Sequence, residues 1–302
     1  MTRDPGPTKS HSPMIAFWNA LPVMIRAILT GILVTIAGTL PWALLASVNS
    51  KFYPEIPWSI VPNAIYLWFY WRYISGKGWP RSTSQFRKRN LRAKPVNAEI
   101  WGASIFAGIM GLVTMLLFFS VLNRLIHLPQ QSTDDVKQFP WLSLFFLLLM
   151  GSAVAGITEE AGFRGYMQGP IEKKHGPVIA ILTTGIFFGL LHFSHPETTW
   201  ALMPFYLSVA IIYGLIAYIT GSILPGLVIH AVGDVLGGLQ VFITGQSEWQ
   251  TPPTPKPLVW ESGADASFWL NSALVVLLFI ITFFAYKGLA KVVKASPALP
   301  EL

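Results

Sequence analysis

The distribution of charged residues constrains the fold of this chain more than any other feature. Only 12% of its 302 residues are Asp, Glu, Lys or Arg, about half the share found in a typical soluble domain. These charges leave long uncharged stretches, and a helix needs about 20 apolar residues to cross a bilayer. The sequence therefore predicts an all-α, polytopic membrane protein, and it excludes a disordered chain, a fibrous protein and an ordinary soluble enzyme.

Eight stretches are candidates for membrane-spanning helices, and the second is short and contains Pro62. We expect the fourth helix to continue to about Gly169, where the Gly-Pro pair ends it. The eight candidates lie between Arg26 and Lys51, Glu55 and Arg72, Glu99 and Arg124, Lys137 and Glu159, and Lys174 and Glu197, near 200–220 and 224–244, and between Asp265 and Lys287.

The loop from Arg72 to Lys94 sets the expected orientation in the membrane. It holds eight Lys or Arg and no acidic residue, and such loops remain on the cytoplasmic side. Alternation of eight spans then places both chain termini in the cytoplasm of an integral plasma membrane protein, which we expect to be a bacterial inner-membrane protein. The basic loop indicates contact with anionic membrane lipid rather than nucleic acid. The oligomeric state stays open.

We divide the chain into three regions. Residues 1–138 hold the N-terminal helices and the basic loop, and residues 246–302 hold a Pro-rich outer loop, the last helix and a basic tail. Residues 139–245 form the expected catalytic core. The chain has no cysteine, which excludes disulfides, thiol nucleophiles and cysteine metal sites.

The core contains ionisable residues within its predicted spans, where they are costly and therefore candidates for function. Glu160 and Arg164 are four residues apart and can form an ion pair on one helix face. His230 and Asp234 have the same spacing and can form a hydrogen bond, and Phe188 and His192 share a face as well. Helix rise places these three clusters at similar depths, which predicts one buried cavity. The candidate catalytic residues are Glu159, Glu160, Arg164, His192, His230 and Asp234.

Two further features accompany these clusters. Glycines stand four residues apart beside each of them, at 165 and 169, 185 and 189, and 233 and 237, which favours close helix packing. The turn from Glu172 to His175 is interpreted as a solvated surface turn. Each polar cluster alone is also consistent with a purely structural role.

The combination of residue types indicates hydrolysis by activated water. Two adjacent carboxylates in a low dielectric cannot both ionise cheaply, so Arg164 can hold one as a carboxylate while the other accepts a proton from water. Histidines can orient that water or stabilise an oxyanion. An alternative uses Glu159, His192 and His230 as zinc ligands with the second glutamate as base, although the sequence has no H-E-x-x-H and Arg164 repels a cation. We expect no cofactor.

The pattern Glu159-Glu160-x-x-x-Arg164, Phe188-x-x-x-His192 and His230-x-x-x-Asp234 resembles the signature of the CPBP family, the CAAX proteases and bacteriocin-processing enzymes. The resemblance covers roughly residues 140–245. It implies an eight-helix intramembrane fold with a catalytic cavity open to the cytosol, and a glutamate-dependent, metal-independent protease.

The resemblance also implies a role for each residue. Glu159 and His192 activate water, His230 and Asp234 form the oxyanion site, and Glu160 and Arg164 order the first motif. In CAAX endopeptidases the last position resembles Asn, so Asp234 weakens the assignment of a CAAX substrate more than that of a hydrolase.

Three functional hypotheses remain open. The first is an endopeptidase that cuts a membrane-associated peptide, either prenylated or otherwise lipidated, or bearing a leader. The second is a non-catalytic membrane regulator or immunity protein of the same fold. The third is a transporter or proton pathway, against which stands the absence of an inverted repeat between the two halves of the sequence.

Overall fold

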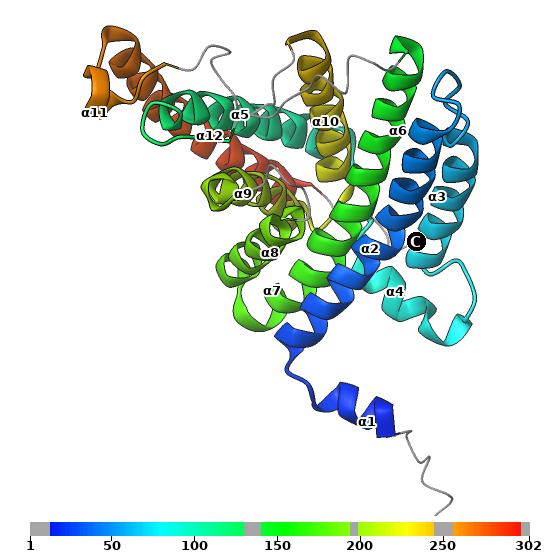
Figure 1. The fold of residues 1–302 in the computed structure, drawn as a ribbon. Coiled ribbons are helices and arrows are strands. Elements are labelled where there is room, and N and C mark those ends of the chain that lie inside the picture. Colours follow the sequence, from blue (N-terminus) through cyan, green and yellow to red (C-terminus); the bar gives the residue numbers. More distant parts are fainter. Residues whose placement is uncertain (1–12, 130–139, 194–198, 245–255, 297–302) are drawn as a thin grey trace, which may run out of the picture.

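The computed structural model describes residues 13–129, 140–193, 199–244 and 256–296. Within these ranges the chain is helical and contains no strand (Figure 1), so the prediction of an all-α fold is confirmed. Both predicted domain boundaries fall in stretches outside the described residues, at 130–139 and 245–255. The helices are α1 (Pro13–Ala20), α2 (Val23–Lys51), α3 (Ile60–Ile74), η1 (Arg81–Thr83), α4 (Ser84–Leu91), α5 (Ala98–Leu122), α6 (Trp141–Glu159), η3 (Glu160–Gln168), α7 (Gly169–His175), α8 (Pro177–His192), η4 (Trp200–Leu202), α9 (Met203–Thr220), α10 (Leu224–Thr244), α11 (Val259–Ser262) and α12 (Ala266–Ala295).

Each of the eight predicted spans corresponds to a helix, and six segments are long and apolar enough to cross a membrane. The chain is therefore an integral membrane protein. The other two predicted spans are α3, with 15 residues, and α8, with 16. At about 1.5 Å per residue, either is shorter than the hydrocarbon core of a bilayer. For these two helices, complete crossing of the membrane stays a prediction.

The predicted break at Gly169 is wrong. Helix α6 runs directly into a π-helical segment, η3, and then into α7, so that Trp141–His175 forms one helical segment of 35 residues. Pro170 lies in the first turn of α7, directly after the π-helical residues. Proline is tolerated at the first turn of a helix, where its missing N–H has little cost. The real turn is Gly176, which has φ 84° and ends α7 before Pro177 starts α8.

This later turn lies midway in sequence between the first two motifs. Glu160 stands sixteen positions before Gly176 and His192 sixteen positions after it. Segments η3 and α7 form one arm of the hairpin and α8 forms the other, and both η3 and α7 pack against α8.

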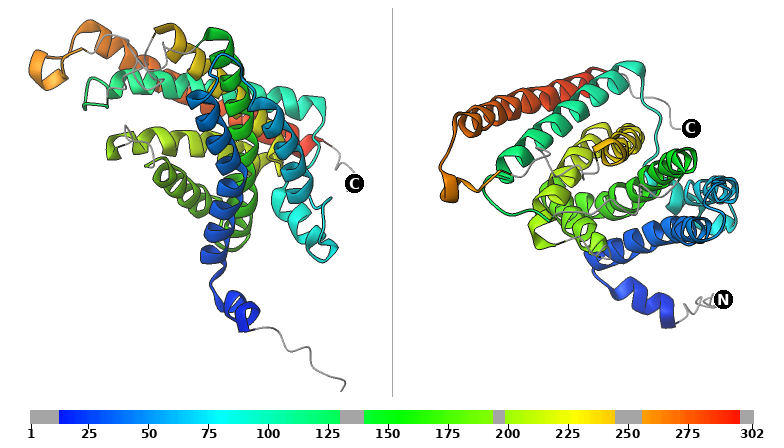
Figure 2. Two further views of the ribbon diagram at one scale, coloured as in Figure 1. Left: turned by 45° about the vertical axis from the view of Figure 1, so that its right-hand side comes forward. Right: turned by 45° about the horizontal axis from the view of Figure 1, so that its top comes forward.

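The helices form a layered bundle. Figure 1 shows α4, α7 and the N-terminal end of α2 at one end of it and α11 at the opposite end. The orientation in the membrane inferred from the basic loop stays a prediction. Figure 2 shows α5 and α12 side by side along one edge of the bundle, with α2 and α3 at the other. Segments α6, η3, α8, α9 and α10, which carry the candidate site, lie between these edges.

Helix α2 packs closely against the π-helical segment. A Cβ added to Gly31 would lie 2.8 Å from the carbonyl oxygen of Gly162, and one added to Gly162 would lie 2.7 Å from the carbonyl oxygen of Gly31. Backbone approaches this close are possible only without side chains, and they increase the van der Waals contact that holds helices together in a membrane. The first motif is therefore held from behind by α2.

The glycine pairs predicted beside the motifs have different roles. Gly185 and Gly189 face Leu207 and Met203 of α9 and allow α8 to pack closely on it. Gly165 instead faces the backbone of α4, where an added Cβ would lie 3.0 Å from the carbonyl oxygens of Asn90 and Leu91. Gly165 therefore allows α4 of the basic loop, rather than another membrane helix, to approach the first motif closely.

Candidate active site

The innermost part of the site is a buried ion pair at the start of η3. Glu160 Oε1 lies 3.1 Å from Arg164 Nη1, and both side chains are completely buried. The guanidinium group is surrounded by the rings of Phe163, Phe188 and Tyr213, at 5.0–6.0 Å from their centroids. The predicted pair therefore exists, and its aromatic surroundings exclude water from it while cation–π contact offsets part of the cost of burying the arginine.

His230 joins this pair to the remaining carboxylates. Its Nδ1 lies 3.0 Å from Glu160 Oε1, so Nδ1 carries a hydrogen and donates it to the carboxylate. Its Nε2 lies 3.7 Å from Glu159 Oε2 and 3.6 Å from Asp234 Oδ2. The ring is thus fixed by Glu160 on one side and presents its second nitrogen to two carboxylates on the other.

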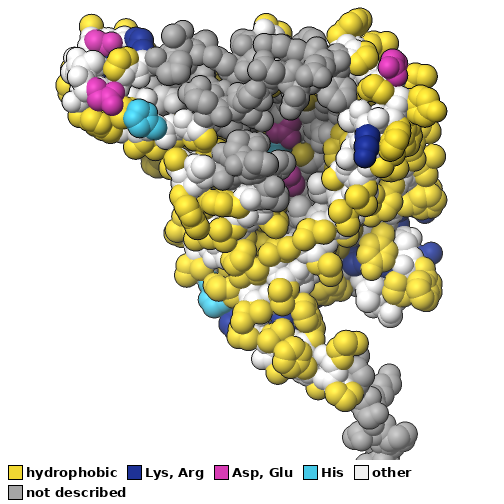
Figure 3. Space-filling model, in the orientation of Figure 1, with side chains coloured by type: hydrophobic (Ala, Val, Ile, Leu, Met, Phe, Trp, Pro, Cys, Tyr) yellow, Lys and Arg dark blue, Asp and Glu magenta, His cyan; other side chains and the backbone are white. Residues whose placement is uncertain are grey.

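Glu159 and Asp234 differ from Glu160 in their access to solvent. Their side chains are 15% and 35% exposed, whereas that of Glu160 is fully buried. Figure 3 shows acidic and histidine side chains at the bottom of a hollow in a largely hydrophobic face. Two adjacent glutamates therefore occupy different environments, and Glu159 is the one that solvent reaches.

His192 completes the set from the end of α8. Its Nδ1 lies 2.7 Å from the carbonyl oxygen of Phe188, which requires a hydrogen on Nδ1 and makes Nε2 the acceptor of the neutral ring. Phe188 and His192 lie on one helix face, with ring centroids 4.7 Å apart. The ring of Phe188 also lies 6.4 Å from that of His230, which places His192 and His230 around the same side chain. The structure thus brings the six predicted residues together from three helical segments.

Small residues allow α10 to approach the first motif. A Cβ added to Gly226 would lie 3.2 Å from Glu160 Oε2, and one added to Gly156 would lie 3.0 Å from the carbonyl oxygen of Leu227. Any larger side chain at either position would push α10 away from α6 and lengthen the contact between His230 and Glu160.

Residues 139–236 match the family model for Rce1-like proteins, described as type II CAAX prenyl endopeptidase Rce1-like. The chain carries an Rce1-like segment. No curated protein and no solved structure matches the chain. The resemblance to CAAX proteases is thereby confirmed for the part of the chain that holds all six site residues. The match covers 98 of the 302 residues, so it relates this segment, rather than the whole chain, to the prenyl endopeptidases.

The Rce1-like segment does not group its acids and histidines as a metal site. Across 13–129, 140–193, 199–244 and 256–296, no three His, Asp or Glu side chains are arranged to hold a metal ion. Nδ1 of His230 already donates to Glu160, which leaves Nε2 as the only nitrogen of this ring for another partner. The expectation of a metal-independent reaction stays a prediction.

The basic loop makes a contact with the Rce1-like segment that could not be predicted from the sequence. Arg92 donates to the carbonyl oxygen of Ala217 at 2.8 Å and pairs with Glu172 at 3.3 Å, and Gln168 donates to the same carboxylate. Glu172 is 16% exposed, so the interpretation of this residue as part of a solvated turn is wrong. A lone arginine in a basic loop carries no spacing signal that would have revealed the contact.

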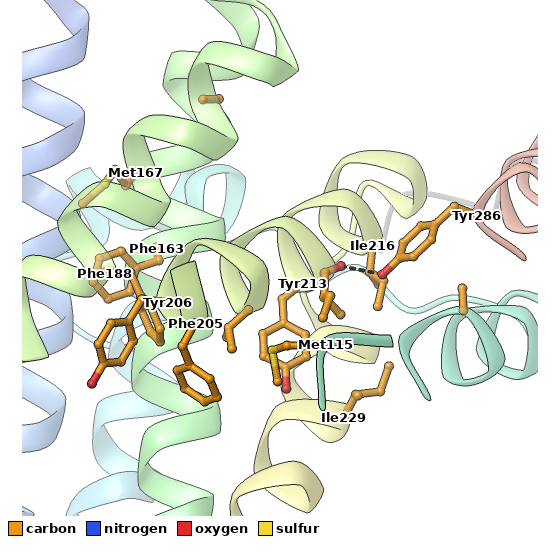
Figure 4. Packing of buried hydrophobic residues seen from close by; sticks show 14 of the residues in the cluster. Met115, Phe163, Met167, Phe188, Phe205, Tyr206, Tyr213, Ile216, Ile229 and Tyr286 are labelled. Atoms are coloured by element: carbon orange, nitrogen blue, oxygen red, sulfur yellow. Dashed lines mark hydrogen bonds between the residues drawn. The ribbon is translucent and has the colours of Figure 1, made fainter. Parts of the chain in front are cut away.

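Helix α9 also contributes to the site, although it contains no charged residue. Tyr206 stacks on His192 and Tyr213 stacks on His230, with centroids 4.4 Å and 4.9 Å apart. Aromatic residues are common in membrane helices, so these two tyrosines gave no signal in the sequence. Figure 4 shows Tyr206 beside Phe163 and Phe188, with Tyr213 farther along the same helix.

Proposed function

We propose that the chain is an intramembrane endopeptidase that hydrolyses a peptide bond of a membrane-associated peptide with water activated by Glu159. The observation that supports this most directly is the contrast between the two adjacent glutamates. Glu160 is buried, forms an ion pair with Arg164 and accepts a hydrogen bond from His230, whereas Glu159 is partly exposed beside His230. A general base must reach both solvent and substrate, and Glu159 meets that requirement.

In this mechanism Glu159 and the Nε2 atom of His192 hold the attacking water and accept its proton. The resulting hydroxide adds to the scissile carbonyl carbon, and the negative charge moves to the carbonyl oxygen. His230 can donate to this oxyanion from Nε2 when its ring is protonated, because Nδ1 is committed to Glu160. Asp234 lies beside Nε2 and fixes that side of the ring.

Glu159 then returns the proton to the leaving nitrogen, and the tetrahedral intermediate collapses to a carboxylic acid and an amine. The acid loses its proton to solvent and leaves as a carboxylate. Glu160 and Arg164 take no part in the proton transfer and orient His230 and the π-helical segment. The substrate is a prenylated or leader-bearing peptide. The protein resides in a bacterial plasma membrane with both termini in the cytoplasm, and the cavity opens to the cytosol.

The test compares variants of purified protein in detergent on a panel of prenylated and leader-type peptides. Glu159→Gln keeps the size of the side chain but removes the base, and we expect it to lower kcat by at least about 100-fold, the lower range for general base catalysis. Glu99→Gln, an exposed glutamate at the start of α5, is the matched control and should cleave like wild type.

Each reaction is run with and without a chelator. A rate of cleavage that the chelator does not change supports the glutamate mechanism. Loss of cleavage with the chelator and rescue by zinc would overturn it in favour of the zinc enzyme. Failure of wild type to cleave any peptide would contradict the proposed function and favour the regulator hypothesis.

A further inference from the structure

One face of α9 contacts all three motifs of the candidate site. Tyr206 stacks on His192 of α8, Tyr213 stacks on His230 of α10, and between them the carbonyl oxygen of Val209 accepts a hydrogen bond from Arg164 Nη2 at 3.5 Å. The two tyrosines are seven residues apart, or about two helical turns, and therefore point from the same side of the helix. No other described helix contacts both histidines through stacked rings.

The geometry of the two contacts is that of ring stacking rather than incidental packing. The planes of His230 and Tyr213 lie 19° apart, and those of His192 and Tyr206 lie 29° apart. Phe188, by contrast, meets both histidines at steeper angles, 54° and 68°. A stacked ring covers one whole face of an imidazole, and a flat contact of this kind restricts rotation about χ2.

A hydrogen bond holds the Nδ1 atom of each imidazole. Nδ1 of His192 donates to the carbonyl oxygen of Phe188, and Nδ1 of His230 donates to Glu160. Stacking on the ring face adds a contact of another kind, because it restricts tilting of the ring about the Nδ1 hydrogen bond. The stacked tyrosines therefore help to define where each Nε2 points.

We infer that Tyr206 and Tyr213 are positioning residues that aim the Nε2 atoms of His192 and His230 into the site. The inference rests on the proposed function for the catalytic roles of the two histidines. The stacking acts through the ring face and not through the phenol oxygen. Phenylalanine should therefore replace either tyrosine, and leucine should not.

Both tyrosines are deeply buried, with 4% and 3% of their surface exposed, so leucine variants also lose packing. Tyr286 of α12 offers a matched control. It is 8% exposed and donates to the carbonyl oxygen of Ile212, and therefore packs on α9 without contacting either histidine. Tyr286→Leu should lower stability by a similar amount but leave the histidines in place.

The first measurement needs no substrate. Diethyl pyrocarbonate modifies unprotonated imidazole nitrogen, and mass spectrometry reports its reaction with His192 relative to the exposed His127. We expect Tyr206→Leu to raise this ratio about 2- to 10-fold, which corresponds to the loss of one aromatic pair. Tyr206→Phe and Tyr286→Leu should leave it unchanged.

The second measurement separates kcat from KM on a cleaved peptide. Tyr206→Leu and Tyr213→Leu should each lower kcat about 10-fold or more with little change in KM, since misaligned catalytic groups affect the transition state. The phenylalanine variants should restore kcat.

The inference is overturned if the ratio for His192 does not change in Tyr206→Leu, or if phenylalanine is as harmful as leucine. A rise in the ratio in a protein that cleaves no peptide would instead contradict the proposed function while retaining the stacking. The two failures are therefore distinguishable.

Discussion

Two arginine–carboxylate pairs of nearly equal length lie in opposite surroundings. Glu160 and Arg164 are 3.1 Å apart with both side chains fully buried, whereas Arg124 and Asp265 are 3.2 Å apart with the carboxylate 49% exposed. Water can solvate the Asp265 carboxylate if the second pair opens, although Arg124 is only 6% exposed. Nothing replaces either partner in the first pair, where both side chains are fully buried. Burial, rather than contact distance, therefore determines how much the protein depends on each pair.

A third pair lies between these extremes. Arg92 and Glu172 are 3.3 Å apart with 12% and 16% of their side chains exposed. The three carboxylates form a graded series, with 0%, 16% and 49% of their side chains exposed. Substitutions in each pair can measure how steeply the loss of stability falls as the exposure of the carboxylate rises.

The largest effect is expected from Arg164→Leu. It leaves Glu160 buried in a low dielectric with one cationic partner removed, and breaking a buried pair in this way costs about 3–5 kcal/mol. Equilibrium unfolding of the purified protein in mixed micelles, followed by tryptophan fluorescence, measures the change. The double variant Glu160→Leu/Arg164→Leu should recover most of the loss, because no uncompensated charge remains. A loss below about 1 kcal/mol for Arg164→Leu alone would show that burial does not govern this pair.

A smaller loss is expected from Arg92→Met, which keeps the length of the side chain but removes its bonds to Glu172 and to the carbonyl oxygen of Ala217. Hydrogen bonds of charged groups contribute about 1.5–3 kcal/mol each when buried, and the partial exposure of this pair reduces the expected loss to about 1–2 kcal/mol. The same unfolding assay applies.

Arg89→Met is the control for this variant. Arg89 is exposed in the same basic loop, so its replacement removes the same charge from the membrane surface without breaking the contact to η3 and α7. Equal losses in the two variants would assign the effect to lipid electrostatics and remove Arg92 from the series.

The sequence predicted the members of the buried pair but not those of the intermediate one, and the reason is physical. A charged residue in a membrane span is rare because it is costly, so Glu160 and Arg164 stood out, and their spacing predicted the contact. Arg92 follows several other basic residues in a loop that is explained by topology alone. Its φ of 58° and its contact with Ala217, 125 positions away, have no local sequence signature.

The fold could be predicted from the sequence where long apolar stretches mark the helices. The positions of eight helices followed from gaps between charges, and the convergence of the motifs followed from helix rise. The π-helical segment was not predictable, because Gly169 and Pro170 read as a helix end. The tyrosines of α9 were not predictable either, since aromatic residues are ordinary in membrane helices. Because ionisable residues are rare in membrane helices, their positions in the sequence indicate the candidate reactive groups of a membrane protein. They say little about the apolar and aromatic residues that position those groups.

The smallest effect is expected at the exposed end of the series, at Asp265, which caps the first turn of α12. Hydrogen bonds from the hydroxyl of Ser267 and the backbone N–H of Phe268, together with Arg124, hold the pKa of this carboxyl well below its usual range. Because this pKa is lowered by folding, the ionised carboxyl stabilises the folded turn at pH values above about 4, the pKa of Asp in the unfolded chain. The contribution disappears as the pH falls through the lowered pKa of the folded state.

Hydrogen exchange at the first turn of α12, corrected for intrinsic rates, should therefore be constant between pH 7 and about pH 5 and increase below about pH 4. Asp265→Asn keeps a good helix cap but cannot titrate, and its exchange should not depend on pH in this window. Global unfolding should be unchanged in this variant, because the pair is solvated when it opens. If Asp265→Asn instead unfolds the protein as readily as Arg164→Leu, exposure does not order the three pairs, and the connection between α11 and α12 contributes as much to stability as the buried site.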